Sequence, residues 1–555
     1  MLPVIRMTKI TEVFKLNCKN PHIIFLSFLA LLSGILIGTS YIPYPPWAIA
    51  FCYLPLWWAV LLSSDEKSYK TIFFLGWISQ FVLTLLGFNW IYFTAREFGD
   101  LNIPVSLAAL LLFASFMHLY IPFSLVIATY FKRKFKLTTT AFIFTMALVH
   151  ILLERTWPSI FEWNLGYTLL WAKSPLAQWA DTVGFWGLSA LIFIFQAILL
   201  YSFLNFKTKK TKSLTVLAIT VLTVVGLSIL GVSKKQTFSK TDSQVKVTIV
   251  QANISNEEKL QAEKGYDYQP YVFNTYFDAT ELELAHINNE TDLIIWPETA
   301  LPVALDKVYH AKPSQQTILN RVKAWQKTLV TGAYSQDTYK RDHLGNLIIR
   351  NSVFFINGDG EAAAPYYKTD LLVFGEYMPF GQEMPFLYKL FPFVGVYERG
   401  PGPIQKAITL ANGQNFTLGP QICYESLNPG FSRGLSKVGA EIFFNLTNDS
   451  WFGDWAEPYQ HMIMTLARGV ENRRPLIRST NTGISTIILA NGEILEQSPI
   501  YQKWAHTYTV PFTKNPPPTF YSKYGYWDWA LWVLILLFIL LVSSERGIRA
   551  RNKKS

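Results

Sequence analysis

The chain has 555 residues, of which half are hydrophobic and only 16% are charged, a composition too apolar for an ordinary soluble protein. It indicates a membrane protein, because the apolar runs are too many and too long for the buried helices of a soluble core. The net charge of +11 comes mainly from short basic clusters without interleaved aromatic residues, which argues against RNA or DNA binding.

Eight apolar runs are each close to the roughly 20 residues that cross a bilayer as a helix. They lie at 23–41, 44–64, 69–93, 103–131, 138–154, 182–204, 213–233 and 528–544. The first run has no small-residue cleavage site and another run follows it at once, so we expect an uncleaved anchor and not a signal peptide. The sequence therefore predicts a polytopic α-helical membrane domain with eight spans.

Basic residues between these runs predict their orientation. Lysine and arginine clusters at 132–136, 207–212 and 546–554 mark the cytoplasmic side of a membrane. Eight crossings with both termini in the cytoplasm satisfy every loop, and they place residues 234–527 on the outer side.

The expected parts of the chain follow from this topology. They are a cytoplasmic leader (1–22), a seven-span membrane domain (23–233), a linker (234–244), an outer domain (245–513), a second linker (514–527), the eighth span (528–544) and a basic cytoplasmic tail (545–555).

In the outer domain, short strand-like runs alternate with helical stretches. Strands are expected at 245–254, 292–296, 328–334, 346–357 and 441–446, and helices at 271–286, 317–327 and 458–473. Asn412-Gly413 and Asn491-Gly492 are hairpin signals between apolar runs. Such alternation predicts a layered α/β domain.

Motifs for metals and cofactors do not stand out. The eight histidines are scattered, and the chain has no His-Glu-x-x-His or Cys-x-x-Cys sequence, so we expect no zinc site of the usual spacing. A Gly-x-Ser-x-Gly elbow and a phosphate-binding loop are lacking too. We therefore expect neither metal nor cofactor, and any chemistry must rely on cysteine, carboxylate and lysine.

Three side chains suited to acyl transfer follow strand-like runs: Glu298, Lys368 and Cys423. A thiolate attacks a carbonyl, a carboxylate takes the thiol proton, and an ammonium stabilises the resulting oxyanion. Cys18 and Cys52 fall in the leader and the second run, so Cys423 has no disulfide partner in the outer domain. For each residue alone, the alternative is a buried thiol or a solvated surface charge.

Four motifs resemble the signatures of the apolipoprotein N-acyltransferase family, nitrilase-superfamily enzymes of bacterial lipoprotein maturation. They are WPETA at 296–300, YKTDLLVFGEYMP at 367–379, ICYES at 422–426 and NDSWFG at 448–453. The likeness covers nearly the whole chain, including the seven-plus-one arrangement of spans. It implies an αββα nitrilase-like sandwich for the outer domain, which would lie in the periplasm of a bacterium whose inner membrane holds the spans.

The resemblance also implies roles for individual residues. Glu298 would be the general base, Lys368 the group that stabilises the transition state, and Cys423 the nucleophile. Supporting residues would be Glu376, Tyr424 and Glu425.

The chain departs from the family pattern at two positions. Leu260 stands where the family often has tryptophan, so no lipid contact is transferred to residue 260, and Ser450 stands where alanine is frequent. Trp451 is retained, and it is either a substrate contact or a core tryptophan. Arg468, Glu471 and Arg473 are expected to form structural ion pairs inside the domain, with phosphate binding as the alternative.

The implied reaction moves a fatty acyl chain from the sn-1 position of a phospholipid, through a cysteine thioester, to the α-amino group of an apolipoprotein's N-terminal diacylglyceryl-cysteine. The partners would be both lipid substrates and the membrane, with no nucleic acid, and a monomer suffices. Apolar stretches at 371–374, 378–380 and 386–396 are expected to be arms that dip into the membrane interface.

Two other functions fit the same residues. The first is a membrane-tethered amidase of the nitrilase type, which would hydrolyse a small amide with the same three side chains. The second is a scaffold that binds lipoproteins without chemistry, although such degenerate domains usually lose one of the three residues.

Overall fold

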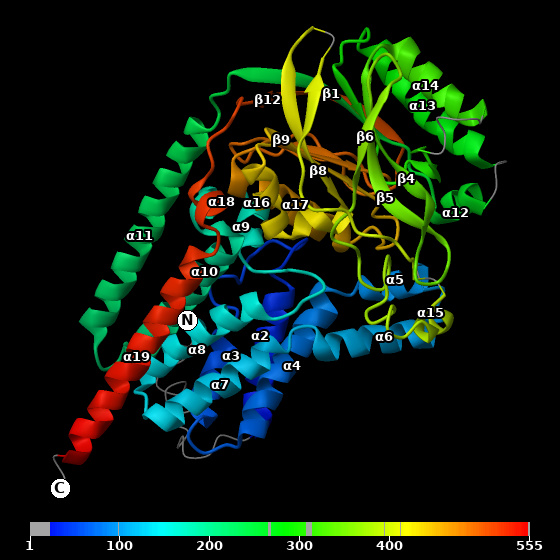
Figure 1. Ribbon diagram of the computed structural model, residues 1–555. Coiled ribbons are helices and arrows are strands. Elements are labelled where there is room, and N and C mark those ends of the chain that lie inside the picture. The colour runs from blue at the N-terminus through cyan, green and yellow to red at the C-terminus, as the bar shows by residue number, and fades with distance from the viewer. Residues whose placement is uncertain are drawn as a thin grey trace, which may run out of the picture.

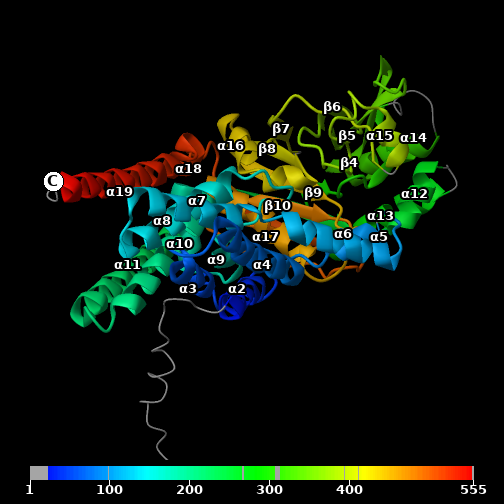
Figure 2. The ribbon, with the colours of Figure 1, turned by 90° about the horizontal axis from the view of Figure 1, so that it is seen from below.

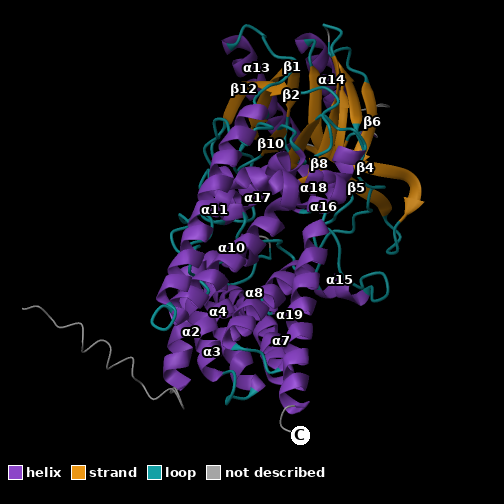
Figure 3. Ribbon diagram, turned by 90° about the vertical axis from the view of Figure 1, so that its left-hand side faces the viewer, coloured by secondary structure: helices purple, strands orange, loops and turns teal. Residues whose placement is uncertain are grey.

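The computed structural model describes residues 23–97, 99–264, 268–306, 313–392, 394–410 and 412–552. A bundle of apolar helices lies below an α/β domain, and the C-terminal helix α19 (Trp527–Asn552) returns to the bundle (Figures 1 and 3). The expected leader, 1–22, and the last residues of the expected tail, 553–555, lie outside the described residues.

The bundle is built from helices that precede the α/β domain, together with α19. They are α2 (Ile23–Gly38), α3 (Leu54–Ser63), α4 (Tyr69–Gly87), α5 (Ile91–Glu97), α6 (Ile103–Phe116), α7 (Tyr120–Phe135), α8 (Thr139–Thr156), α9 (Tyr167–Trp171), the 3₁₀ helix η1 (Pro175–Trp179), α10 (Ala180–Asn205) and α11 (Lys210–Thr237). Helices α11 and α19 lie at the edge of the bundle (Figures 1 and 2).

Within the described residues, six helical stretches are long and apolar enough to cross a membrane. They are Tyr69–Gly87, Ile103–Phe135, Thr139–Thr156, Pro175–Asn205, Lys210–Thr237 and Trp527–Glu545. Helices α2 and α3 are apolar but have only 16 and 10 residues. The structure therefore supports several spans without confirming eight.

Proline explains why the second expected span is shorter than its apolar run. Residues 44–53 form turns, and helix begins only at Leu54. Pro55 lies in the first turn of α3 and has no backbone N–H to bond the carbonyl of residue 51, so a helix cannot continue back through it, and Pro45 and Pro46 disfavour helix before them. Hydropathy alone therefore overestimates the helix in this run.

The α/β domain contains two sheets. The first has the order β12-β1-β2-β4-β5-β6, with β3 also paired to β4, and the second has the order β11-β10-β9-β8-β7. The strands of the first are β1 (Ser243–Gln251), β2 (Leu293–Ile295), β3 (Leu301–Ala304), β4 (Thr328–Arg341), β5 (Leu347–Ile356), β6 (Ala362–Tyr367) and β12 (Trp504–Phe512). Those of the second are β7 (Lys406–Thr409), β8 (Asn415–Ile422), β9 (Ile442–Thr447), β10 (Leu476–Thr480) and β11 (Thr486–Ile488).

Alternating side chains of the first sheet fill two separate cores. Ile294 and Trp296 pack in the core beneath the helices α12 (Asn256–Lys264), α13 (Gln269–His286) and α14 (Pro313–Trp325), whereas Ile295 packs in the core shared with the second sheet. Across the sheets, the ring centroids of Phe355 and Phe444 are 6.0 Å apart. The helices α16 (Pro429–Lys437) and α17 (Glu457–Asn472) cover the other sheet, which completes an αββα sandwich (Figure 1).

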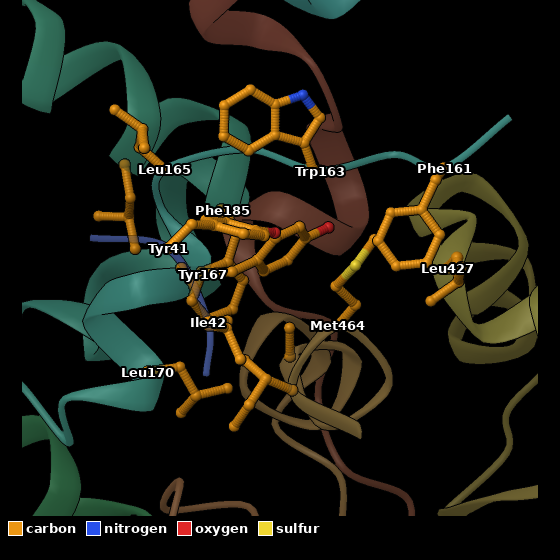
Figure 4. Close-up of a cluster of buried hydrophobic side chains, with 14 of the residues drawn as sticks. Tyr41, Ile42, Phe161, Trp163, Leu165, Tyr167, Leu170, Phe185, Leu427 and Met464 are labelled. Atoms are coloured by element: carbon orange, nitrogen blue, oxygen red, sulfur yellow. The ribbon is translucent and has the colours of Figure 1, made fainter. Parts of the chain in front are cut away.

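Helix α17 also faces the bundle, so it joins the two parts of the molecule. Figure 4 shows Tyr41, Trp163 and Tyr167 of the bundle in one apolar cluster with Leu427 and Met464 of the α/β domain. Residues far apart in sequence therefore share one buried junction.

The junction contains the three charged residues expected to form ion pairs. Arg468 lies 2.9 Å from Glu471 and donates a hydrogen bond to Tyr167, and Glu471 accepts one from the backbone of Phe185. Arg473 lies 2.8 Å from Asp181. The Arg468–Glu471 pair lies inside the domain as expected, whereas Arg473 pairs with Asp181 of the bundle, because α17 packs against α9 and α10.

Candidate active site

The three residues expected to carry chemistry follow the strands β2, β6 and β8 and come together between the sheets. Lys368 Nζ lies 3.2 Å from Glu298 Oε1 and 2.9 Å from Glu376 Oε1. All three of these side chains are largely buried. The carboxylates of Glu298 and Glu376 thus share one ammonium.

Asn351 completes this group, and sequence reasoning missed it. Its Nδ2 donates to Glu298 Oε1 at 2.7 Å and to Glu376 Oε1 at 3.0 Å. The amide therefore holds both carboxylates in place around Lys368. The available signal was a polar residue inside the apolar run of β5, LIIRNSVFFI.

Lys368 remains charged despite its burial. Burial by itself lowers the pKa of Lys368, but the carboxylates of Glu298 and Glu376 outweigh this effect and raise the pKa well above its ordinary value. The site therefore holds a buried cation.

Cys423 lies on a sharp turn between β8 and the 3₁₀ helix η4 (Cys423–Leu427). Its φ of +51° is in the left-handed region, which is costly for a residue with a side chain and recurs at functional sites. The side chains of Ser426 and Asn445 donate to its carbonyl oxygen at 2.9 and 3.1 Å. These contacts hold the turn.

The thiol of Cys423 interacts electrostatically with both partners. Burial and the negative charge of Glu298 raise its pKa well above the ordinary value, against the opposing effect of Lys368. The resting thiol is therefore protonated, so attack on a carbonyl requires a base at the moment of reaction. The structure thus brings Cys423, Glu298 and Lys368 together.

Glu425 ties the Cys423 turn to the segment after Lys368. Its carboxylate accepts hydrogen bonds from the backbone of Ile422 at 2.6 Å and of Thr369 at 2.5 Å, and from the hydroxyl of Tyr366 at 2.6 Å. Burial raises the pKa of Glu425 to about 7, while these donors oppose the shift. Glu425 is therefore a positioning residue in this geometry.

Tyr424 points from the Cys423 turn towards the junction. Its partly buried ring has its centroid 5.5 Å from that of His461 and 6.3 Å from that of Phe161 in the bundle. Trp451 is also partly buried and packs against the intersheet core, whereas Leu260 is exposed on α12.

Glu376 also anchors the apolar segment that follows it. Its Oε2 accepts a hydrogen bond from the backbone of Leu372 at 2.9 Å. Beyond it, the helix α15 (Phe386–Leu390) projects from the α/β domain down to the level of the bundle (Figures 1 and 3). The side chains of Phe380 and Leu390 are 70% and 63% exposed, which is unusual for a folded surface facing water.

Three acidic and imidazole groups near Tyr424 could offer ligands to a metal. Atoms of Asp449, Glu457 and His461 lie within 4.8 Å of one another. However, Arg478 Nη2 already lies 2.7 Å from Asp449 Oδ2, and His461 Nδ1 lies 3.0 Å from Asp449 Oδ1. A protein cation therefore already pairs with the central carboxylate, and we assign no metal to this cluster.

Lys259 is a second buried lysine beside Glu298. Its Nζ donates to the backbone oxygen of Glu298 at 3.3 Å and to Thr299 Oγ1 at 3.1 Å. Burial lowers the pKa of Lys259 to about 8, and the charge of Glu298 opposes this shift. Lys259 therefore changes charge near neutral pH next to the candidate base.

We expect the replacement Lys259→Arg to change the pH dependence of the reaction. In the unaltered chain, Lys259 loses its proton as pH rises through about 8, so the rate of thioester formation should fall there because the donor to the Glu298 turn loses its charge. Arginine stays charged at these pH values, so the fall should disappear. A pH profile identical in both proteins would contradict this role, and Lys259→Met should lower the rate about tenfold below pH 8 and by less above it, where Lys259 is already neutral.

Known proteins and protein families are similar to this chain over most of its length. The family described as Carbon-nitrogen hydrolase matches residues 234–508, and that described as Apolipoprotein N-acyltransferase N-terminal domain matches residues 33–198. A Bdellovibrio bacteriovorus protein named Apolipoprotein N-acyltransferase is 46% identical over 95% of this chain and 95% of its own length. Proteins of the same name from Rickettsia bellii and Geobacter metallireducens are 30% and 28% identical, over 93% and 90% of this chain and 96% and 91% of theirs.

Proposed function

Because the chain belongs to the apolipoprotein N-acyltransferase family, we propose that Cys423 carries the acyl group while Glu298 and Lys368 activate it. The chain is an acyltransferase that N-acylates lipoproteins, and its lipid donor and lipoprotein acceptor are in the membrane. The observation that carries the proposed roles is the buried contact between Lys368 and Glu298 at 3.2 Å, both of which act on the Cys423 thiol.

In the first half-reaction, Glu298 takes the thiol proton as the sulfur of Cys423 attacks the sn-1 ester carbonyl of a phospholipid. The Lys368 ammonium stabilises the oxyanion of the tetrahedral intermediate. The carbon–oxygen ester bond then breaks, and the departing lysophospholipid oxygen takes the proton from Glu298. A thioester remains on Cys423.

In the second half-reaction, the neutral α-amino group of the diacylglyceryl-cysteine attacks this thioester. Lys368 again stabilises the oxyanion, the carbon–sulfur bond breaks, and Glu298 carries a proton from the amine to the sulfur. The products are an amide and the free thiol. Glu376 and Glu425 keep Lys368 and Cys423 in place throughout, as their hydrogen bonds indicate.

The membrane is where both substrates reside. Exposing an acyl chain to water costs roughly 0.8 kcal/mol per CH₂, so the enzyme has to receive its lipids from the bilayer. We place the α/β domain in the periplasm, with both termini in the cytoplasm of a multi-pass inner-membrane protein, from the basic clusters between spans. The exposed apolar side chains of the expected arm, Phe374, Phe380, Phe386 and Leu390, would then enter the interface, and Trp451 would contact an acyl chain.

The arm can be tested with a double replacement, Phe386→Ser with Leu390→Ser. Removing two exposed apolar side chains, each worth about 1.5–3 kcal/mol when buried, should raise the KM for phospholipid in vesicles at least tenfold. The rate with a short-chain, water-dispersed ester should stay unchanged, because the Cys423 site is untouched. Leu282→Ser on α13, where the leucine is 75% exposed, is the matched control, and an equal effect there would contradict an arm.

The proposed reaction is tested by incubating the purified chain with phospholipid and then with a diacylglyceryl peptide. Mass spectrometry should detect an acyl group on Cys423 after the first step and its transfer to the peptide amine after the second. Hydrolysis of small amides without acylation by phospholipid would instead favour the tethered amidase. The reaction requires one chain only, so a monomer is sufficient.

A further inference from the structure

A pocket of about 350 Å³ lies beside the junction, and its lining residues are distant from Cys423 in the sequence. It is formed where α8 ends and α10 and α19 begin, and its walls include Arg155, Trp157, Glu162, Trp186, Tyr526 and Trp529. Exposed aromatic rings at the start of a membrane helix, such as Trp527 and Trp529, are typical of the level of lipid headgroups.

The charges of this pocket leave one carboxylate without a partner. Arg155 Nη1 lies 3.2 Å from Asp528, and its guanidinium lies 3.8 Å from the ring centroid of Tyr526. Glu162 lines the pocket without a direct ion pair in the described part of the chain, and the positive charges of Arg468 and Arg155 act on it only electrostatically. Because Arg155 pairs with Asp528, Glu162 is the remaining carboxylate of the pocket, and it contributes a negative charge among aromatic side chains in its ionised form.

The same loop reaches the candidate active site. Phe161, next to Glu162, has its ring 6.3 Å from Tyr424. Burial raises the pKa of Glu162 to about 7; the positive charge of Arg468 opposes this shift, and the negative charge of Asp370 adds to it. Asp370 follows Lys368 by two residues, so Glu162 lies within electrostatic reach of the segment that holds the Lys368 cation.

Aromatic rings are a recurring receptor for organic ammonium groups, and here a carboxylate lines the same pocket as tryptophan and tyrosine rings. We propose that this pocket binds the ammonium group of a lipid substrate, with Glu162 as its counter-ion and Trp186 and Trp529 as its aromatic walls. Arg155, whose Nη2 has no hydrogen-bond partner within the described chain, provides a cation for a neighbouring phosphate. This inference rests on the proposed function, and it assigns a binding position for one of the lipid substrates of the Cys423 site.

Two lipids of the proposed reaction carry an ammonium group. One is a phospholipid with an amine headgroup, and the other is the acceptor, whose α-amino group is protonated before it reacts. The two half-reactions separate them, because the first involves only the donor and the second starts from a preformed thioester and involves only the acceptor.

The experiment uses the full chain and the variant Glu162→Gln in vesicles. The first measurement compares rates of thioester formation from phosphatidylethanolamine and phosphatidylglycerol with identical acyl chains. If the donor binds the pocket, the unaltered chain should prefer the amine lipid about tenfold, and the variant should lose this preference. The second measurement determines the KM for a diacylglyceryl peptide with both proteins acylated on Cys423 to the same extent. If the acceptor binds the pocket, this KM should rise about tenfold in the variant.

Two further variants serve as a control and as an independent test of the pocket. Glu97→Gln removes the same charge from an exposed position and should change neither measurement, whereas Trp529→Leu should act like Glu162→Gln through the aromatic wall. If Glu162→Gln and Trp529→Leu each change the lipid preference and the KM for the peptide less than twofold while the thioester forms normally, the pocket does not bind substrate and the proposed function stands. If the unaltered chain forms no thioester from any phospholipid, the proposed function fails and this inference fails with it.

Discussion

Replacing Cys423 by alanine is expected to abolish the acyl-enzyme and to lower N-acyltransferase activity by about 10³-fold or more. Within the described part of the chain, the one other thiol is that of Cys52, which is buried in the helical bundle and cannot replace it. The replacement removes a small side chain from a turn held by backbone contacts, so the fold should persist. Mass spectrometry after incubation with phospholipid measures the acyl group directly.

The matched control for this variant is Cys52→Ala, which removes the buried thiol of the bundle and should retain acylation. Cys423→Ser tests the same step more finely, since a hydroxyl is a far weaker acid than a thiol and Glu298 would not ionise it. Full complementation of an acyltransferase-deficient strain by Cys423→Ala would contradict the thioester and support a binding scaffold.

Replacing Lys368 by methionine is expected to remove activity and stability together. The ammonium is bonded to two buried carboxylates, Glu298 and Glu376, and its loss leaves their charges uncompensated. Breaking a buried ion pair in this way costs about 3–5 kcal/mol of folding free energy. Thermal unfolding should therefore begin at lower temperature, and thioester formation should fall by about 10²–10³-fold, as when an oxyanion donor is lost.

A double variant separates the two effects. Adding Glu376→Gln to Lys368→Met removes one of the stranded charges, so it should restore part of the stability without restoring activity. Recovery of activity in the double variant would show that Lys368 only neutralises carboxylates and does not act on the oxyanion. Lys406→Met, a lysine near β6 that is not part of the site, should change neither measurement.

Local sequence was sufficient for much of the fold. The strand expected at 245–254 corresponds to β1 (Ser243–Gln251), and the helix expected at 458–473 to α17 (Glu457–Asn472). Such elements depend on hydrophobic periodicity and turn residues, which are properties of neighbouring positions. The candidate residues Glu298, Lys368 and Cys423 were expected for a related reason, because each follows a strand-like run.

The limits appear where distant segments meet. The expected 44–64 span was too long because prolines delay α3 until Leu54. Arg473 proved to pair with Asp181 of the bundle, and Arg468, paired with Glu471 inside the domain as expected, also donates a hydrogen bond to Tyr167 of the bundle. Asn351 and Lys259 looked like ordinary polar residues of a strand and a helix. Their contacts with Glu298 exist only because β5 and α12 pack beside the end of β2.

The stretch from Gly419 to Ser426 illustrates both what the sequence determines and what only the tertiary structure decides. By itself it determined that a lone cysteine follows a strand and precedes a carboxylate, since these are facts of order along the chain. Only the tertiary structure decided that this thiol lies in a left-handed turn, protonated by burial, within electrostatic reach of a carboxylate and a cation. Desolvation and Coulomb interactions depend on distance in space and not on separation in sequence, so they emerge only when the sheets close over the site.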